Sequence, residues 1–287
     1  MMTEPAYAKL NLSLDILGKR PDGYHELRMV MQSIDLADQV ALSPRPEPGC
    51  AVAADLPYLP RDGGNIAAKA AAAFFAQSGV PPEGLSIAIR KSIPVCAGMA
   101  GGSSDGAAVL RILRRLYAPE MPAERLEEIG ALVGSDVPYC VRGGTALAEG
   151  RGERLTALPP LPPCHLAVCK PPCSISTPEL FALVRVKKLR CHPDTAGMLR
   201  ALESGDLEGA VRRIYNVFED ALPRRYAEVF SIKSELLNLG ALAASMTGSG
   251  PTVFGVFRDR ESAARAVEAL SGQYEAVYLC RPAQPDW

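Results

Sequence analysis

A loop of small residues holds the groups in this chain that are best suited to chemistry. Its sequence is Pro94-Val95-Cys96-Ala97-Gly98-Met99-Ala100-Gly101-Gly102-Ser103-Ser104. Glycines let the backbone come close to phosphate oxygens, and the start of a following helix adds unpaired N–H groups and the positive end of its dipole. The hydroxyls of Ser103 and Ser104 suit helix caps, a phosphate or a bound Mg²⁺. The pattern therefore predicts either a polyphosphate cradle or a glycine-rich turn before a capped helix.

Two pairs of side chains near the N-terminus are further candidates for a site. Lys9 and Asn11 share the polar face of an alternating strand predicted at 6–17, and that face is either solvated or the floor of a site. Tyr24 and His25 follow a turn at 18–23. They are either the first residues of a strand or a stacking and hydrogen-bonding pair for a flat ligand.

Two later segments combine glycine with polar side chains. Asp136, in Gly134-Ser135-Asp136-Val137-Pro138, is either a helix cap or a partly buried carboxylate. The run Thr247-Gly248-Ser249-Gly250-Pro251 is either a simple hairpin turn or a second loop that faces phosphate.

The composition limits the classes of function. The chain of 287 residues has a formal net charge of −1, so no overall basic field favours nucleic acid or an anionic membrane as a partner. The N-terminus lacks a basic stretch followed by an apolar one, and no apolar run reaches the roughly 18 residues of a membrane span, which indicates a cytoplasmic protein. The cysteines and histidines between 164 and 192 lack paired Cys-x-x-Cys spacing, so reduced thiols are a better interpretation than a metal site.

The predicted elements indicate an α+β chain of two domains, at 1–158 and 164–287, joined by a proline-rich linker. In the first domain, Asn65 opens a predicted helix, and a stretch before it at 43–63 is irregular. Strands and helices alternate in the second domain, which predicts a sheet with helices on one face. The elements expected in the first domain are strands at 6–17, 27–34 and 85–91 and helices at 66–77, 107–117 and 122–133.

The spacing of apolar residues in the helix at 107–117 predicts which of its faces is buried. Leu110, Leu113 and Leu116 are expected to face inward and Arg111, Arg114 and Arg115 outward.

Three signals stand in a fixed order along the chain: the Lys/Asn strand, the Pro-x₃-Gly-x-x-Gly-Gly-Ser-Ser loop before a helix, and Thr-Gly-Ser-Gly-Pro near the C-terminus. In this order they resemble the GHMP small-molecule kinases, which include galactokinase, homoserine kinase and mevalonate kinase, and the resemblance spans nearly the whole chain. It implies a two-domain fold, with an N-terminal domain like domain 2 of ribosomal protein S5 and a ferredoxin-like α+β C-terminal domain. ATP and substrate would lie in the cleft between them.

Four further segments narrow the resemblance to the branch that phosphorylates 4-diphosphocytidyl-2-C-methyl-D-erythritol. They are Ala8-Lys9-Leu10-Asn11-Leu12, Arg20-Pro21-Asp22-Gly23-Tyr24-His25-Glu26-Leu27, Gly134-Ser135-Asp136-Val137-Pro138 and Asn216-Val217-Phe218-Glu219. That branch belongs to the non-mevalonate (MEP) route to isoprenoid precursors, and it transfers the ATP γ-phosphoryl group to the 2-hydroxyl of the methylerythritol moiety. The alternatives are another acceptor within the superfamily (mevalonate, homoserine or a sugar) and a non-catalytic ligand-binding protein on the same fold.

The resemblance also implies a role for each candidate residue. Asp136 would be the catalytic base, with Lys9 beside it. The residues expected to contact ATP are Pro94, Gly98, Gly101, Gly102, Ser103, Ser104, Asn65, Lys91, Thr247 and Gly248, with Asn65 and Lys91 near the adenine and Ser103 or Ser104 near Mg²⁺. The residues expected to hold the substrate are Asn11, Tyr24, His25, Thr177 and Phe181. The expected partner is a small molecule, and the expected assembly is a monomer or a weak homodimer.

The chain departs from the family pattern at three places. Where the family loop often reads Gly-Leu-Gly-Gly-Gly-Ser-Ser, this chain has Met99 and Ala100, and Ala100 fits only if its backbone avoids a positive φ. Asp105 puts a carboxylate near a polyphosphate, which is unfavourable unless it points away or contacts Mg²⁺. The segment 186–193, with Lys187, Lys188 and Arg190, matches nothing in the family pattern.

Overall fold

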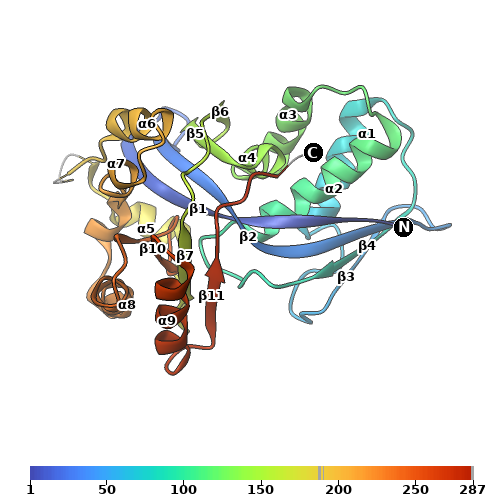
Figure 1. The fold of residues 1–287 in the computed structure, drawn as a ribbon. Helices are drawn as coiled ribbons and strands as arrows, with labels where there is room; N and C mark the ends of the chain where they lie inside the picture. Colours follow the sequence, from blue (N-terminus) through green and yellow to red (C-terminus); the bar gives the residue numbers. More distant parts are fainter. Residues whose placement is uncertain (187–188, 190, 286–287) are drawn as a thin grey trace.

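The structure, a computed structural model, describes residues 1–186, 189 and 191–285, so Lys187, Lys188 and Arg190 lie outside the described residues. Within this part of the chain, the larger sheet has seven strands in the order β3-β4-β2-β1-β8, with β5 and then β6 continuing from β2 (Figure 1). The strands are β1 (Met2–Lys19), β2 (His25–Pro44), β3 (Cys50–Ala54), β4 (Leu85–Arg90), β5 (Thr145–Gly150), β6 (Arg154–Ala157) and β8 (Tyr215–Asn216). Strand β3 lies inside the stretch 43–63, so the prediction that this whole stretch is irregular was wrong.

Helices cover one face of the larger sheet (Figure 1). They are α1 (Ile66–Ser78), α2 (Gly101–Tyr117), α3 (Ala123–Val133) and α4 (Val137–Arg142). Their apolar side chains, such as Phe74, Leu110 and Ile129, are fully buried in the core. Asn65 opens α1 as predicted, since its side chain accepts a hydrogen bond of 2.9 Å from the Ala67 N–H.

The smaller sheet is antiparallel and has the strand order β11-β7-β10-β9. Its strands are β7 (His165–Lys170), β9 (Ala243–Met246), β10 (Val253–Phe257) and β11 (Ala276–Cys280). If these four strands are numbered 1 to 4 along the chain, their order across the sheet is 4-1-3-2, which is the order of a ferredoxin-like sheet. Helices α8 (Ala227–Asn238) and α9 (Arg260–Ser271) pack on this sheet.

The remaining helices lie on the other side of the smaller sheet or beside it. They are α5 (Thr177–Leu183), α6 (Thr195–Glu203) and α7 (Leu207–Val211), with short 3-10 turns at Val217–Ala221 and Arg224–Tyr226. Met198 of α6 and Val211 of α7 share a core cluster with Val168 and Val256 of the sheet and with Leu10 of β1. The prediction of helices on one face was therefore wrong, because α6, α7 and β1 bury the second face.

Two expectations for α2 were also wrong. The helix begins at Gly101, inside the small-residue loop, and Ala100 rather than a serine is its N-cap residue. Arg111 is buried and pairs with Glu4, while Leu116 is partly exposed. The buried face of α2 is therefore rotated about the helix axis relative to the predicted one. The paired Glu4 belongs to β1, and no local periodicity reveals a partner so distant in sequence.

Among the described residues, no helix is long and apolar enough to cross a membrane.

Candidate active site

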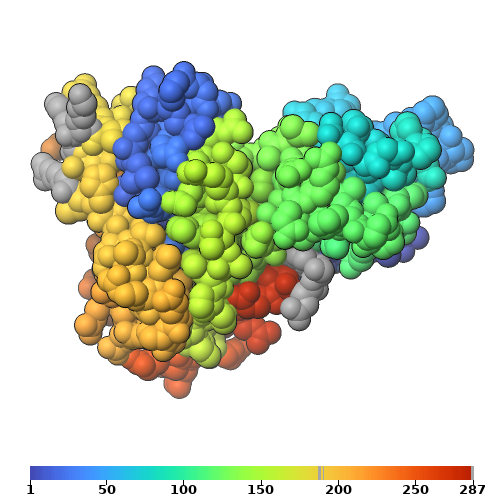
Figure 2. Space-filling model, turned by 90° about the horizontal axis from the view of Figure 1, so that it is seen from above, coloured from blue at the N-terminus to red at the C-terminus, as the bar shows by residue number. Residues whose placement is uncertain are grey.

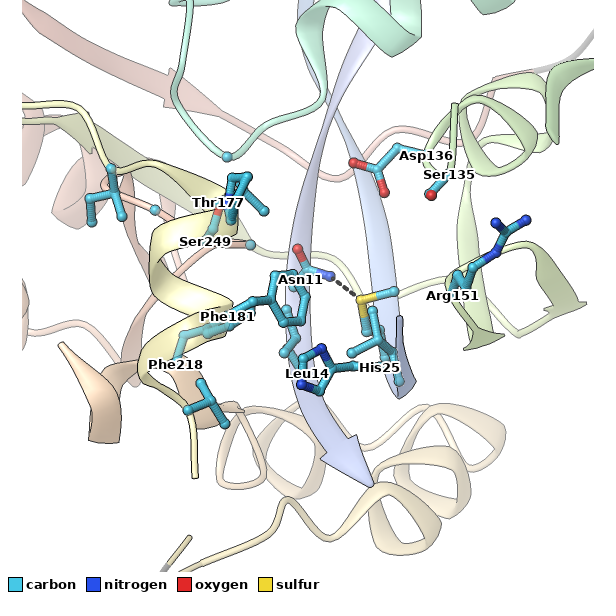
Figure 3. A pocket seen from close by; sticks show the side chains of 18 of the residues that line it. Asn11, Leu14, His25, Ser135, Asp136, Arg151, Thr177, Phe181, Phe218 and Ser249 are labelled. Carbon is cyan, nitrogen blue, oxygen red and sulfur yellow. Dashed lines mark hydrogen bonds between the residues drawn. The ribbon is translucent and has the colours of Figure 1, made fainter. Parts of the chain in front are cut away.

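A cavity of about 1030 Å³ opens where the two sheets meet, and most of the candidate residues surround it. Strand β1 forms its floor with Asn11 and Leu14, as Figure 3 shows. Thr177, Phe181 and Ser249 stand on one side, and Ser135, Asp136 and Arg151 stand on the opposite side. In the view from above, the end of the β1–β2 pair (blue) emerges between the segment that contains α5 (yellow) and that of β5 and β6 (yellow-green) (Figure 2). The cavity thus lies between segments far apart in sequence.

Lys9 and Asn11 lie on the cavity floor and are almost fully buried. The β1–β2 register has irregularities on both sides of this pair, between Tyr7 and Lys9 and between Asn11 and Ser13. Lys9 Nζ donates hydrogen bonds to Asn11 Oδ1 (2.6 Å) and to the Gly98 carbonyl (2.8 Å). The polar face of β1 is therefore the floor of a cavity and is not solvated.

Asp136 also lines the cavity, at the N-cap of α4, but its side chain makes no cap hydrogen bond there. A carboxylate that does not cap its own helix remains available for a ligand. Burial lowers the pKa of Lys9, and the nearby negative charge of Asp136 opposes that shift. The two side chains are thus electrostatically coupled.

The small-residue loop meets the cavity through Cys96, Gly98, Ala100 and Ser103. Ala100 has φ 59° and Cys96 has φ 53°, both in the left-handed region that favours glycine. The condition that Ala100 avoids a positive φ is thus not met, and the loop adopts this backbone although two of its residues are not glycine.

The two serines of the loop have different surroundings. Ser104 is buried, and its hydroxyl donates a 2.6 Å hydrogen bond to the Tyr7 carbonyl. Ser103 faces the cavity. Gly101 and Gly102 do not line the cavity: side-chain methyls of Ile93 and Ile66 lie 3.1 and 3.2 Å from where their Cβ atoms would be. Close packing therefore favours glycine at both positions.

Several residues predicted to contact ATP do not line this cavity. Among the described residues, Pro94, Asn65, Lys91 and Thr247 are not part of its lining. The Lys91 ammonium is buried and paired with two carboxylates, those of Asp38 and Asp105. Asp105 hence points to Lys91, and burial raises the pKa of its carboxyl to about 7, with Lys91 opposing this shift and Asp38 adding to it.

The second glycine loop, 247–251, packs directly against the first. The position where a Cβ of Gly98 would stand is 2.5 Å from the Thr247 carbonyl oxygen, and that of Gly248 is 2.8 Å from the Gly98 carbonyl oxygen. Thr247 Oγ1 accepts a hydrogen bond of 3.0 Å from the Asn11 N–H. Only glycine allows the two backbones to approach so closely.

Asn216 and Glu219, from the Asn-Val-Phe-Glu segment, hold this second loop in place. Asn216 Nδ2 donates to the carbonyls of Met246 (2.8 Å) and Gly248 (2.9 Å). Glu219 accepts from the Ser245 hydroxyl (2.7 Å) and from the Met246 N–H (2.8 Å). The segment therefore acts on the site through the backbone of the loop.

Aromatic rings form the other end of the cavity. His25 and Phe181 stack with ring centroids 4.9 Å apart and planes 19° apart, and Phe218 meets Phe181 edge-on. Arg151, which the sequence analysis missed, lies over the exposed ring of Tyr24 with its guanidinium carbon 5.0 Å from the ring centroid. It follows the last residue of β5, and nothing in its local sequence points to Tyr24, which is more than 120 positions away.

Thr177, at the start of α5, lies next to Ser249 on the same side of the cavity, with their hydroxyl oxygens 2.6 Å apart.

Burial and the positive charge of Lys19 lower the pKa of His25. Its imidazole is therefore neutral near pH 7 and offers one nitrogen as donor and one as acceptor.

Comparisons with known proteins agree with this geometry. Residues 65–144 match the family model for the GHMP kinases N terminal domain, and residues 198–276 match the model for the GHMP kinases C terminal. A protein of Clostridium botulinum named 4-diphosphocytidyl-2-C-methyl-D-erythritol kinase is 41% identical over 280 residues, which cover 98% of this chain and 99% of that protein. A protein of the same name from Clostridium perfringens is 42% identical and covers 98% of both chains.

Solved structures lead to the same family. The crystal structure of a 4-(cytidine 5'-diphospho)-2C-methyl-D-erythritol kinase superposes with a TM-score of 0.82 at 31% identity, over 99% of this chain and 100% of that one. A homoserine kinase from Cytophaga hutchinsonii has a TM-score of 0.74 at 18% identity, over 95% of this chain and 92% of that one, and shows the shared fold. The chain belongs to the GHMP kinase family. Its fold is the two-domain α+β fold of these kinases. Within that family, its full-length relatives named above are 4-diphosphocytidyl-2-C-methyl-D-erythritol kinases.

Proposed function

We propose that this chain transfers the γ-phosphoryl group of ATP to the 2-hydroxyl of 4-diphosphocytidyl-2-C-methyl-D-erythritol, a step of the non-mevalonate route to isoprenoid precursors. The observation that carries the proposal is that one cavity has two chemically different ends. Lys9, Asp136 and the glycine loop form one end, and the stacked His25 and Phe181 form the other. The names of the full-length relatives support the same substrate.

At the reacting end, phosphoryl transfer needs mainly positioning and charge stabilisation. The acceptor oxygen forms a bond to the γ-phosphorus, the bond from that phosphorus to the bridging oxygen breaks, and ADP leaves. Asp136 accepts the hydroxyl proton, and the Lys9 ammonium, held by Asn11 and Gly98, stabilises negative charge on the transferred group. Gly98 and Ser103 line the cavity, and the Gly98 backbone and the Ser103 hydroxyl would face the phosphates.

Mg²⁺ fits the oxygen donors at this end. Among the described residues, no group of three or more His, Cys, Asp or Glu side chains could hold a metal ion. Mg²⁺ commonly binds through one or two protein oxygens together with substrate phosphates, so the Ser103 hydroxyl would complete a site that ATP supplies. When bound, the ion would neutralise charge on the phosphates.

At the recognition end, the cytosine ring would stack with the aromatic rings of Tyr24, His25 and Phe181. The neutral imidazole of His25 offers a donor and an acceptor to the edge of a base. Asn11 and Thr177 would hold the methylerythritol diphosphate between the two ends.

Thr247 and Gly248 would close the site over the phosphates of ATP. Asn65 and Lys91 stay the residues predicted near the adenine. A cytoplasmic monomer or weak homodimer, without nucleic acid or membrane partners, also stays a prediction.

The test is conversion of ATP to ADP with Mg²⁺ and each of four acceptors: 4-diphosphocytidyl-2-C-methyl-D-erythritol, mevalonate, homoserine and galactose. We expect turnover with the cytidine acceptor alone. In Asp136→Asn, kcat should fall by about 10²- to 10⁴-fold, since general base catalysis is worth that factor. Glu261→Gln, which neutralises an exposed carboxylate on α9, is the matched control and should not change kcat.

Other outcomes separate the alternatives. Turnover with mevalonate, homoserine or galactose would keep the reacting end and reject the cytosine pocket. Protection of the wild-type chain by CMP or CDP, without turnover of any acceptor, would instead indicate a ligand-binding protein on the same fold. Unchanged ATP turnover in Asp136→Asn would exclude Asp136 as the base.

A further inference from the structure

Three buried side chains next to the glycine loop form an ion cluster, which we call the Lys91 cluster: Asp38 of β2, Lys91 after β4, and Asp105 of α2. Lys91 Nζ donates to Asp38 Oδ2 and, at 2.7 Å, to Asp105 Oδ2. Each of the three side chains is at most 5% exposed. None of them is among the described residues that line the cavity, so the cluster is not placed to hold the substrate directly.

The Lys91 cluster joins the two ends of the loop. On the entry side, Asp38 Oδ1 accepts from the backbone N–H groups of Ser92 (2.6 Å) and Ile93 (2.8 Å), which directly precede Pro94. On the exit side, Asp105 lies in the first turns of α2. Lys91 Nζ is the common partner of both carboxylates. The cluster therefore fixes the distance between the start of the loop and the start of its helix.

The loop between these two ends needs such support. Cys96 and Ala100 both have left-handed backbones, at φ 53° and 59°, which an L-residue adopts only at a cost in free energy. A strained backbone of this kind persists where the surrounding structure over-determines it, and it is often found at functional sites. Both residues line the cavity, so relaxation of either one would change the surface that faces the phosphates.

We propose that the Lys91 cluster holds the glycine loop in its strained, ATP-binding conformation. Asp38, Lys91 and Asp105 are then positioning residues, which act on ATP through the backbone of the loop. This inference rests on the proposed function, in that the loop is taken to bind the triphosphate. It also gives the Lys91 ammonium a role other than contact with the adenine.

The test measures ATP affinity directly by calorimetry, with no acceptor present. Asp105→Leu keeps the branched shape, breaks the link to α2 and leaves Lys91 and Asp38 as a charge-balanced pair. We expect its Kd for ATP to rise by about tenfold, the factor that 1.4 kcal/mol represents. CDP affinity should stay within about twofold of wild type. Asp105→Asn, the conservative variant, keeps an oxygen that accepts from Lys91 and should lose much less affinity.

A rescue variant separates positioning from general stability. Adding Ala100→Gly to Asp105→Leu removes the strain that the cluster opposes, and should recover most of the lost ATP affinity. A loss of thermal stability alone would not be restored in this ligand-specific way. If Asp105→Leu does not fold, Asp38→Asn serves instead, because its amide oxygen still accepts from Ser92 and Ile93 while its NH2 group replaces the oxygen that accepts from Lys91.

Inorganic tripolyphosphate separates the loop from the adenine. The proposal predicts that Asp105→Leu weakens tripolyphosphate and ATP by the same factor. A loss confined to ATP would show that Lys91 acts on the base and would overturn the proposal. Equal ATP affinity in Asp105→Leu and wild type would also overturn it, and leave the proposed function intact. A wild-type chain that binds no ATP would contradict the proposed function itself.

Discussion

Lys9 and His25, at opposite ends of the cavity, both have lowered pKa values, with different consequences. For Lys9 the cause is burial, and the charge of Asp136 opposes it. Removing that charge would lower the Lys9 pKa further. Asp136→Asn would therefore remove the proposed base and also reduce the positive charge of Lys9 beside the proposed phosphoryl site. For His25 the causes are burial and the charge of Lys19, and they favour the neutral imidazole.

The pKa of His25 predicts how acceptor binding depends on pH. Because the folded-state pKa lies below the ordinary value of about 6.5, the imidazole stays neutral at pH 7 and gains a proton only as the pH falls through that lowered value. The proton removes its acceptor nitrogen. We expect the KM for the cytidine acceptor to be constant from about pH 7 to 8 and to rise only as the pH falls through the lowered pKa of His25.

Steady-state kinetics of wild type and His25→Gln, at several pH values, check this prediction. Glutamine keeps a donor and an acceptor but does not titrate, so its KM should be higher than wild type at pH 7 and nearly independent of pH. The KM for ATP is the internal control and should not follow the acceptor. The same rise at low pH in His25→Gln would assign the effect to another group.

Two loops from opposite halves of the chain form one structural element. Glycine at positions 98 and 248 lets the two backbones come into close contact. The Asn216 side-chain amide holds the second loop by donating hydrogen bonds to the carbonyls of Met246 and Gly248. Each loop taken alone is compatible with an ordinary turn. Their contact, with Lys9 Nζ 3.1 Å from where a Cβ of Gly248 would stand, makes them a single surface around the lysine.

A methyl group at Gly248 should separate the loops. Gly248 has φ 56°, so Gly248→Ala brings backbone strain of about 1–2 kcal/mol and also a Cβ placed 2.8 Å from the Gly98 carbonyl oxygen. Gly205→Ala is the matched control, since Gly205 has φ 68° but no atom within 4 Å of its Cβ position. Urea unfolding should show a loss of stability in both variants. Only Gly248→Ala should lower kcat/KM, by about tenfold or more.

Equal kcat/KM values in Gly248→Ala and Gly205→Ala would mean that the contact between the loops does not matter for turnover.

The sequence predicted many elements correctly, because their signals are local. Asn65 before an alanine-rich run, and the apolar alternation of Leu85 to Ile89, are complete within one segment, and α1 and β4 appear there. The errors arose where a distant partner decides the outcome. Arg111 has the spacing of a solvated face, yet Glu4 of β1 allows its burial, and Ala100 adopts a positive φ although its residue type disfavours it. The links between Arg151 and Tyr24, and between Asn216 and the loop at 247–251, likewise join residues that no short motif connects.

At the scale of the whole molecule, the two sheets are linked by more than the chain between them. Strand β1 belongs to the larger sheet, but Leu10 and Leu12 lie in a core cluster with side chains of the smaller sheet. The segment that follows β11 returns to the larger sheet, where Pro282 pairs with Ile34 of β2 (Figure 1). The Ala283 N–H donates to the Ser33 carbonyl at 2.8 Å.

The pairing of this last segment reaches α4, whose N-cap residue is Asp136, the proposed base. Ser33 Oγ lies 3.1 Å from the hydroxyl of Tyr139, and Tyr139 is in α4, three positions after Asp136. Gly144 N–H, after α4, also donates to Ser33 Oγ at 3.1 Å. We therefore expect a change in the pairing of residue 283 to act through Ser33 on the position of the Asp136 carboxylate.

Ala283→Pro tests this connection, because proline removes the N–H that bonds to Ser33 while the chain keeps its length. We expect a lower Tm, by about 2–4 °C for each kcal/mol lost, and a several-fold lower kcat with unchanged Kd for ATP. Ala283→Ser keeps the N–H and is the matched control, with wild-type kcat. A lower Tm with wild-type kcat in Ala283→Pro would show that the segment stabilises the fold without acting on Asp136. A lower kcat together with weaker ATP binding would instead show that the effect also reaches the glycine loop, which lies at the same end of the cavity as Asp136.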